Sequence, residues 1–262
     1  MIGRIWAIAL NTFREAARIR VLYGIIVLVL GANLFAIVLG EMSRNSEARV
    51  ARDVGLAGIS LFGSLTAIFL GVFLLYSEIQ RRTIHGIVSK PIARWEFVIG
   101  KYAGMALVLS VLVGLFGLAM AGMLLWQDVG IGSAVIKALV LSWMEVLTVA
   151  AIAIFFSSFS TPFLSGIFAL AMWGIGRVTP DIEAAAKFAA PWIRHTANVA
   201  LRIVPDLHLF SISGRTVDGS TVSVHSDFVS WGYVGLASAH GLCWIVGLVT
   251  LAAVLFHRRD FA

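Results

Sequence analysis

The chain has 262 residues, of which 60% are hydrophobic and only 13% are charged, and its mean hydropathy is +0.94. A soluble globular domain carries about 25% charged residues, so this composition excludes that class and indicates a protein that crosses a membrane several times. The net charge of +6 is expected in cytoplasmic loops rather than on a nucleic-acid-binding surface, because such loops concentrate lysine and arginine. The single cysteine, Cys243, excludes an intrachain disulfide.

The predicted fold is an all-α polytopic membrane protein with one domain, residues 1–262. A membrane-spanning helix needs about 20 mostly apolar residues, and six segments meet or approach this length: Val21–Gly40, Val54–Ser77, Phe97–Leu125, Ala134–Ser157, Pro162–Gly176 and Trp231–Phe256. The fifth is short and begins at Pro162. With six spans both termini lie on one side, and the lysine and arginine residues of the N-terminal arm, of the loop after span two and of the tail predict that this side is cytoplasmic.

The N-terminal arm, residues 1–20, has the pattern of an amphipathic helix. Ile5, Ile8 and Phe13 fall mainly on one face, and Arg14 and Arg18 fall mainly on the other. This pattern favours a helix that lies in the inner membrane interface, an elbow before the first span. The alternative is a cytoplasmic extension of the first span.

The segment 178–230 is a long outer loop between spans five and six, too long for a simple connector. Ile182–Leu201 has few helix breakers apart from Pro191, which predicts short helices packed on the outer membrane face. Arg215–Asp227 is rich in glycine, serine, threonine and valine, which predicts a small hairpin around Asp218-Gly219.

The sequence lacks three short motifs that mark common classes of enzyme. It contains no Gly-x-x-x-x-Gly-Lys-Ser/Thr phosphate-binding loop, no His-Glu-x-x-His zinc motif and no Gly-x-Ser-x-Gly nucleophile elbow. The chain is therefore not expected to be an enzyme, to hydrolyse ATP itself, or to hold a metal or another cofactor.

Two ionisable residues, Glu145 and His240, fall inside predicted spans four and six. Glu145 lies about 11 residues, and His240 about nine residues, from the outer ends of their spans. At about 1.5 Å per residue they are expected at similar depth, and they can pair if the helices are neighbours. A carboxylate at that depth must be paired, protonated or in contact with water. A contact on a substrate path, a gate and a structural hydrogen bond between helices all fit this pattern. An acid–base pair of an intramembrane enzyme fits less well, because no compact catalytic motif accompanies it.

The most basic loop, residues 78–96, lies between spans two and three. Ile84, Ile87 and Val88 share one face of a predicted helix, which Pro91 ends. An apolar stripe at the cytoplasmic surface needs a cover, which is either the lipid interface or a groove on a protein partner.

Four stretches resemble the ABC-2 type exporter permeases in order and spacing: Asn11–Glu15, Glu78–Lys101, Phe156–Pro162 and His257–Phe261. Within the second stretch, the motif residues are Glu78, Arg82-Thr83 and Lys90-Pro91-Ile92-Ala93-Arg94. The most similar subgroup is the NosY-like permeases, which are associated with copper-enzyme maturation. Arg82 replaces a glycine found in many members, and many members lack the long outer loop.

This resemblance implies a permease subunit in the bacterial cytoplasmic (inner) membrane, working as two copies with two ABC ATP-binding subunits that bind the ATP. The loop would then hold a coupling helix whose partner-binding residues are Glu78, Arg81, Arg82, Thr83, Ile84, Ile87 and Val88. Membrane lipid and a periplasmic protein are the other expected partners. The implied function is ATP-driven export along a path lined by spans one, two and five. The alternative is transmission of mechanical work to the periplasmic protein without moving a substrate.

Overall fold

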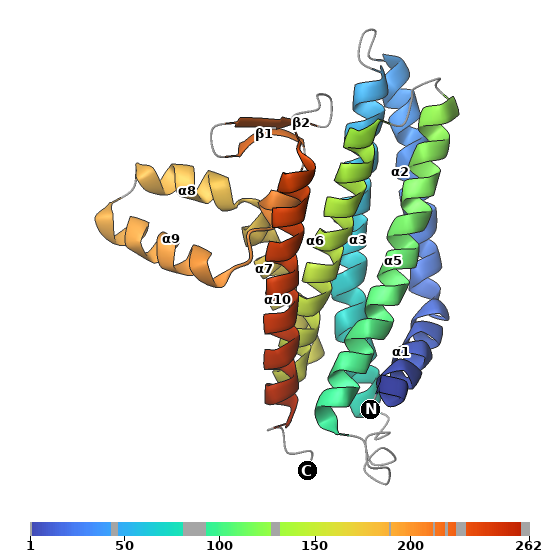
Figure 1. Ribbon diagram of the computed structural model, residues 1–262, viewed down its shortest axis with the longest axis vertical. Helices are drawn as coiled ribbons and strands as arrows, with labels where there is room; N and C mark the ends of the chain where they lie inside the picture. Colours follow the sequence, from blue (N-terminus) through green and yellow to red (C-terminus); the bar gives the residue numbers. More distant parts are fainter. Residues whose placement is uncertain are drawn as a thin grey trace.

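The computed structural model describes residues 2–42, 47–80, 93–126, 132–188, 190–211, 213–217, 220–223 and 229–257. Its elements in chain order are α1 (Ile2–Ala17), α2 (Arg20–Met42), α3 (Glu47–Gln80), α5 (Arg94–Trp126), α6 (Ser133–Phe159), α7 (Pro162–Arg177), α8 (Thr179–Lys187), α9 (Pro191–Ile203), η1 (Leu207–Phe210), β1 (Ser213–Val217), β2 (Ser220–Ser223) and α10 (Trp231–His257). The long helices run side by side in one bundle, and α8 and α9 project sideways from it (Figure 1).

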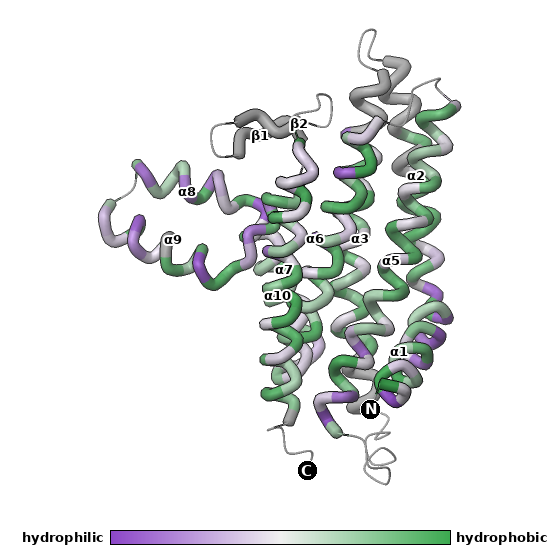
Figure 2. The backbone as a smooth tube through the Cα atoms, in the orientation of Figure 1, coloured by the Kyte–Doolittle hydropathy of each residue, from purple (hydrophilic) through white to green (hydrophobic). Residues whose placement is uncertain are grey.

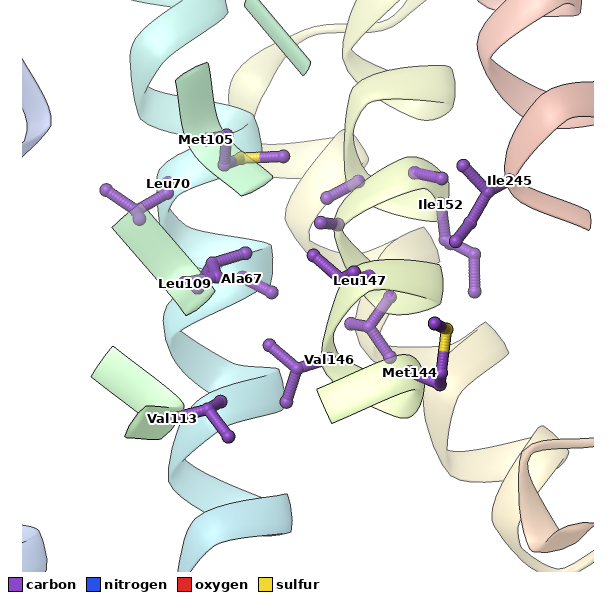
Figure 3. Close-up of a cluster of buried hydrophobic side chains, with 14 of the residues drawn as sticks. Ala67, Leu70, Met105, Leu109, Val113, Met144, Val146, Leu147, Ile152 and Ile245 are labelled. Carbon is purple, nitrogen blue, oxygen red and sulfur yellow. The ribbon is translucent and has the colours of Figure 1, made fainter. Parts of the chain in front are cut away.

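Helix α6 is the centre of the bundle. It packs against α3, α10, α7 and α5, and it is apolar around most of its circumference, as a helix covered on all sides must be. Figure 3 shows the resulting core, in which Leu70 of α3, Leu109 of α5, Leu147 of α6 and Ile245 of α10 lie among other buried apolar side chains.

Close contact between α3 and α6 depends on two glycines. A Cβ atom added to Gly63 would lie 2.7 Å from Val146 Cγ2, and one added to Gly71 would lie 2.5 Å from Ala153 Cβ. Both distances are shorter than carbon atoms tolerate, so a side chain at either position would force the neighbouring helix to shift. These two small residues therefore serve packing within the chain.

Within the described residues, four helices are long and apolar enough to cross a membrane, in α3, α5, α6 and α10. Helices α7 and α8 together count as a fifth candidate that is bent by 63°. Helix α7 has only 16 residues, about 24 Å, against a hydrocarbon thickness of about 30 Å. In α2 the shorter apolar stretch is Leu22–Gly31, so the bundle has four to five clear candidate spans where the sequence predicts six.

Helix α1 is separate from α2 and packs along the first part of α5. Ideal Cβ atoms at Gly100 and Gly104 would lie 2.7 Å from Ile8 Cβ and 2.5 Å from the carbonyl oxygen of Ala9. Glu15 Oε2 accepts a hydrogen bond of 3.1 Å from Lys101 Nζ, and the Lys101 side chain is buried. The chain leaves the helical conformation between α1 and α2, as an elbow helix before the first span requires. The position of α1 relative to a membrane stays a prediction.

The segment between α7 and α10 confirms two expectations. The predicted short helices are α8 and α9, and Pro191 begins α9 instead of interrupting a helix, because proline is tolerated in a first turn. Strands β1 and β2 are antiparallel and flank residues 218–219, so the predicted hairpin is present beside the helices.

Candidate functional site

The lengths of α6 and α7 place an acidic and a basic side chain at the same height along the bundle. Helices α6 and α7 are joined by a tight turn at residues 160–161. Glu145 lies 14 positions before the end of α6, and Arg177 lies 15 positions after the start of α7. These spacings correspond to about 21 and 22 Å along antiparallel neighbours, so Arg177 comes level with Glu145.

The two side chains form an ion pair. Arg177 Nη1 lies 2.9 Å from Glu145 Oε1, and the Glu145 side chain is 1% exposed while that of Arg177 is 29% exposed. Ser60 of α3 donates a hydrogen bond of 2.5 Å to Glu145 Oε2 and accepts one from Arg177. The guanidinium carbon also lies 5.8 Å from the centre of the Trp173 ring. Three helices are thus tied together by one polar cluster, Ser60, Glu145 and Arg177.

This cluster lines a small cavity of about 50 Å³. The remaining wall is made of polar and apolar residues: Asp53, Ser142, Ser211, Leu56, Ala57, Ala138 and Phe210. The cavity has room for a few water molecules beside the polar residues of its wall. Because a buried ion pair is stable only when its remaining hydrogen-bonding capacity is met, such a cavity can supply water to the pair.

Glu145 has a different partner from the predicted one, His240. Helices α6 and α10 are neighbours, as the prediction required, but Ser60 and Arg177 occupy the carboxylate from α3 and α7. The His240 ring lies 6.4 Å from the Trp244 ring, and its Nε2 atom has no hydrogen-bond partner among the described residues. His240 and Cys243 border a shallow apolar hollow on α10.

Sequence reasoning missed Arg177 and Ser60 as partners of Glu145. Arg177 falls between the short fifth predicted span, which ends at Gly176, and the outer loop, which begins at residue 178, so the sequence does not place it inside the membrane. The nearly equal spacing of Glu145 and Arg177 from the α6–α7 turn is the signal that identifies this pair. Ser60 carries no such signal, since its role depends on how α3 rotates against α6.

An apolar groove lies between α3 and α7. Its volume is about 310 Å³, and it is lined by Leu65, Ile68, Phe69, Val72, Phe73, Pro162 and Gly166. The rings of Phe69 and Phe73 stack with their centres 5.6 Å apart. A groove of this composition suits the acyl or aromatic part of an amphiphile.

Most of the predicted partner-binding residues lie outside the described residues: Arg81, Arg82, Thr83, Ile84, Ile87 and Val88. Glu78 belongs to the last turn of α3, which continues to Gln80, and α5 begins at Arg94. The end of α3 and the start of α5 lie at the same end of the bundle as α1 and the end of α10 (Figure 1). In the part of the chain that the structure describes, no three histidine, cysteine or acidic residues are placed to hold a metal ion.

A family model described as ABC-2 family transporter protein matches residues 6–261. The chain belongs to this family. No curated protein matches the chain. Membership makes the chain a multi-pass membrane protein and a permease-type subunit of an ABC transporter, a class of subunit that is typically not catalytic. It also implies an ABC ATP-binding partner.

Proposed function

We propose that the chain is the membrane subunit of an ATP-driven exporter. The observation that carries the proposal is the match to the ABC-2 family over residues 6–261. The proposed assembly has two copies of this chain, each with six spans including α2 and α7, and two ATP-binding subunits. In this assignment both termini and residues 81–92 face the cytoplasm of a bacterial cell, and the β1–β2 end faces outward.

The proposed coupling site is residues 78–89. Ile84, Ile87 and Val88 would enter a groove on the ATP-binding subunit and supply the anchor, while Glu78, Arg81 and Arg82 would set its orientation at the rim. Because α3 and α5 flank this segment, closure of the ATPase pair would move both helices. Helix α1 would move with α5, since the glycine contacts and the Glu15–Lys101 ion pair join them closely.

The proposed substrate path runs between two copies, along α2, α3 and α7. The apolar groove of α3 and α7 supports an amphiphilic substrate, such as a lipid, a peptide or a drug-like molecule. Ser60 of α3 and Arg177 of α7 meet beyond this groove, level with the middle of α6, where Glu145 lies. We assign the cluster to holding the path closed at that level, because separating α3 from α7 requires this polar contact to break.

The double substitution Ile84→Asp and Ile87→Asp tests the coupling site. Two carboxylates in an apolar anchor prevent docking, so we expect loss of the stimulation that the chain gives to its ATP-binding subunit. The matched control is Trp126→Asp, which adds a charge at an 86% exposed position at the opposite end of α5. The assignment is wrong if the double variant remains folded and still stimulates ATP hydrolysis normally.

A second function is favoured by the folded outer segment. Among the described residues of the segment 178–230 are α8, α9, η1, β1 and β2, which is more structure than a simple connection between spans needs. In a NosY-like subunit this segment would transmit force to a periplasmic protein with nothing crossing the membrane. Deletion of residues 215–227 separates the two functions, because an exporter should retain transport whereas a force transmitter should lose its partner.

A further inference from the structure

Lys137, in the second turn of α6, is a lysine with little exposure to water. Only 6% of the residue is exposed. Its Nζ atom lies 5.5 Å from the centre of the Trp231 ring, and in the part of the chain that the structure describes it forms no ion pair. A cation–π contact compensates only part of the cost of taking an ammonium group out of water. The charge of Lys137 is therefore largely unbalanced.

Two acidic side chains of the bundle do not reach Lys137. Glu145, eight positions or about 12 Å further along α6, is paired with Arg177. Asp53 belongs to α3, which meets α6 at Val146. Val146 lies nine positions after Lys137 and therefore on the opposite face of α6. The ammonium group is thus available to an anion from outside the described residues.

The starts of two helices add positive potential at the same place. Helices α6 and α10 both begin at the end of the bundle opposite the N-terminus (Figure 1). Neither has an acidic residue in its first turn, and Gly132, the N-cap of α6, provides no side-chain cap. The start of α10 is capped by Ser230, whose Oγ atom accepts a hydrogen bond of 3.1 Å from the N–H of Tyr233. Helix N-termini without acidic residues favour a bound anion.

The position of the lysine selects the kind of anion. Figure 2 shows that the long helices are hydrophobic over most of their length, and near the ends of such helices lysine and tryptophan meet the phosphate groups of lipids. Trp231 and Leu242 lie 11 positions apart, on one face of α10, and are 58% and 49% exposed. This face offers an apolar surface to an acyl chain next to the ammonium group.

We propose that Lys137 and the starts of α6 and α10 form a binding site for a phosphate group. The ammonium group of Lys137 binds the phosphate, and the Trp231 ring covers one side of it. The phosphate belongs to a phospholipid of the surrounding leaflet or is free in solution. When bound, it joins α6 to α10 at this end of the bundle. The site depends neither on ATP coupling nor on transport.

Native mass spectrometry of the full chain in mild detergent tests the proposal. The chain is titrated separately with short-chain phosphatidylglycerol, short-chain phosphatidylcholine and inorganic phosphate. We expect phosphatidylglycerol to bind more tightly than phosphatidylcholine, whose choline group balances its phosphate. Lys137→Met, which keeps the length of the side chain without its charge, should weaken this binding by about tenfold or more, and Lys137→Arg should retain it.

The matched control is Lys187→Met, which removes the same charge from an exposed position of α8. Its affinity for phosphatidylglycerol should equal that of the parent chain. If Lys137→Met does not fold, Lys137→Gln replaces it. Inorganic phosphate that binds as tightly as the lipid, and is lost in Lys137→Met, would assign the site to a free anion, whereas tighter binding of the lipid assigns it to a phospholipid.

Two results would overturn the proposal. Equal weakening by Lys137→Met and Lys187→Met would mean that the overall charge of the chain, and not this site, attracts the lipid. Asp128 and Asp227 belong to the segments that precede α6 and α10 and lie outside the described residues. Binding that requires Asp128→Asn and Asp227→Asn would mean that the chain itself neutralises Lys137.

Discussion

At the scale of single residues, the ion pair of Glu145 and Arg177 is asymmetric. The carboxylate is fully buried, whereas the guanidinium retains 29% exposure. Loss of either partner leaves a charge without its counterion, but only Arg177 can turn toward water. The two single substitutions should therefore differ, even though they break the same bond.

We predict that Arg177→Leu destabilises the chain by about 3–5 kcal/mol, since it leaves a buried carboxylate uncompensated. Glu145→Leu should destabilise it less. The double variant should be more stable than Arg177→Leu alone, because no charge remains. Thermal unfolding of all three variants in one detergent measures this, and equal losses for Arg177→Leu and the double variant would show that the charge is not the cause.

Asp206 lies outside the spans, between α9 and η1. Its Oδ1 atom accepts a hydrogen bond of 3.1 Å from the backbone N–H of His208 and so caps η1. Burial raises the pKa of this carboxyl, although the hydrogen bond and the nearby imidazoles of His208 and His240 oppose the rise and Glu183 adds to it. The folded state thus holds the proton of Asp206 more tightly than the unfolded chain does.

The raised pKa of Asp206 sets the direction of a pH effect. Its protonation stabilises the fold below the unfolded value of about 3.9, and this contribution is lost as the pH rises through the folded value. Asp206→Asn keeps the capping oxygen without the charge, so we predict that its stability gain over the parent grows from pH 4 to pH 7. Apparent Tm values across this range measure it, and a gain that is constant or falls with pH would contradict the assignment.

At the scale of elements, the α3–α6 contact depends on the absence of side chains at Gly63 and Gly71. Gly58 provides a comparison in the same helix, because a Cβ atom there would meet nothing within 4 Å. Glycine also weakens any helix interior relative to alanine. Substitution of glycine by alanine should therefore lower the stability of the fold at Gly63 or Gly71, where the helices touch, and should not lower it at Gly58.

We predict that Gly71→Ala destabilises the chain by about 1–3 kcal/mol, because the new methyl group overlaps Ala153. Gly58→Ala, the control, should be neutral or stabilising by up to about 1 kcal/mol. Adding Ala153→Gly to Gly71→Ala should restore part of the loss. Unfolding by heat or denaturant measures all three, and a harmless Gly71→Ala would show that α3 and α6 are less closely packed than described.

The elements that the sequence predicts well are those with a local signal. Apolar length predicts the four long spans, the scarcity of helix breakers predicts the short helices α8 and α9, and the turn residues predict the hairpin around residues 218–219. The partners of Glu145 are not visible in hydropathy. Arg177 can be found only from its distance to the α6–α7 turn, and Ser60 depends on how α3 rotates against α6.

At the scale of the whole molecule, one end of the bundle and its middle differ in chemistry. At one end, the end of α3 and the start of α5 adjoin α1, which is joined to α5 by Glu15 and Lys101. The Glu145–Arg177–Ser60 cluster lies about midway along α6, and the α8–α9 pair projects from the side of the bundle (Figure 1). This arrangement supports an account in which an ATP-binding partner acts at the first end and the movement reaches the polar cluster in the middle.

The most direct test of this account is native mass spectrometry of the chain purified in mild detergent together with the products of neighbouring genes. We predict a complex of two copies of this chain with two copies of an ATP-binding subunit. The Ile84→Asp and Ile87→Asp variant should lose that subunit while remaining folded. Recovery of the chain without any ATP-binding subunit, under conditions in which it stays folded, would contradict the account.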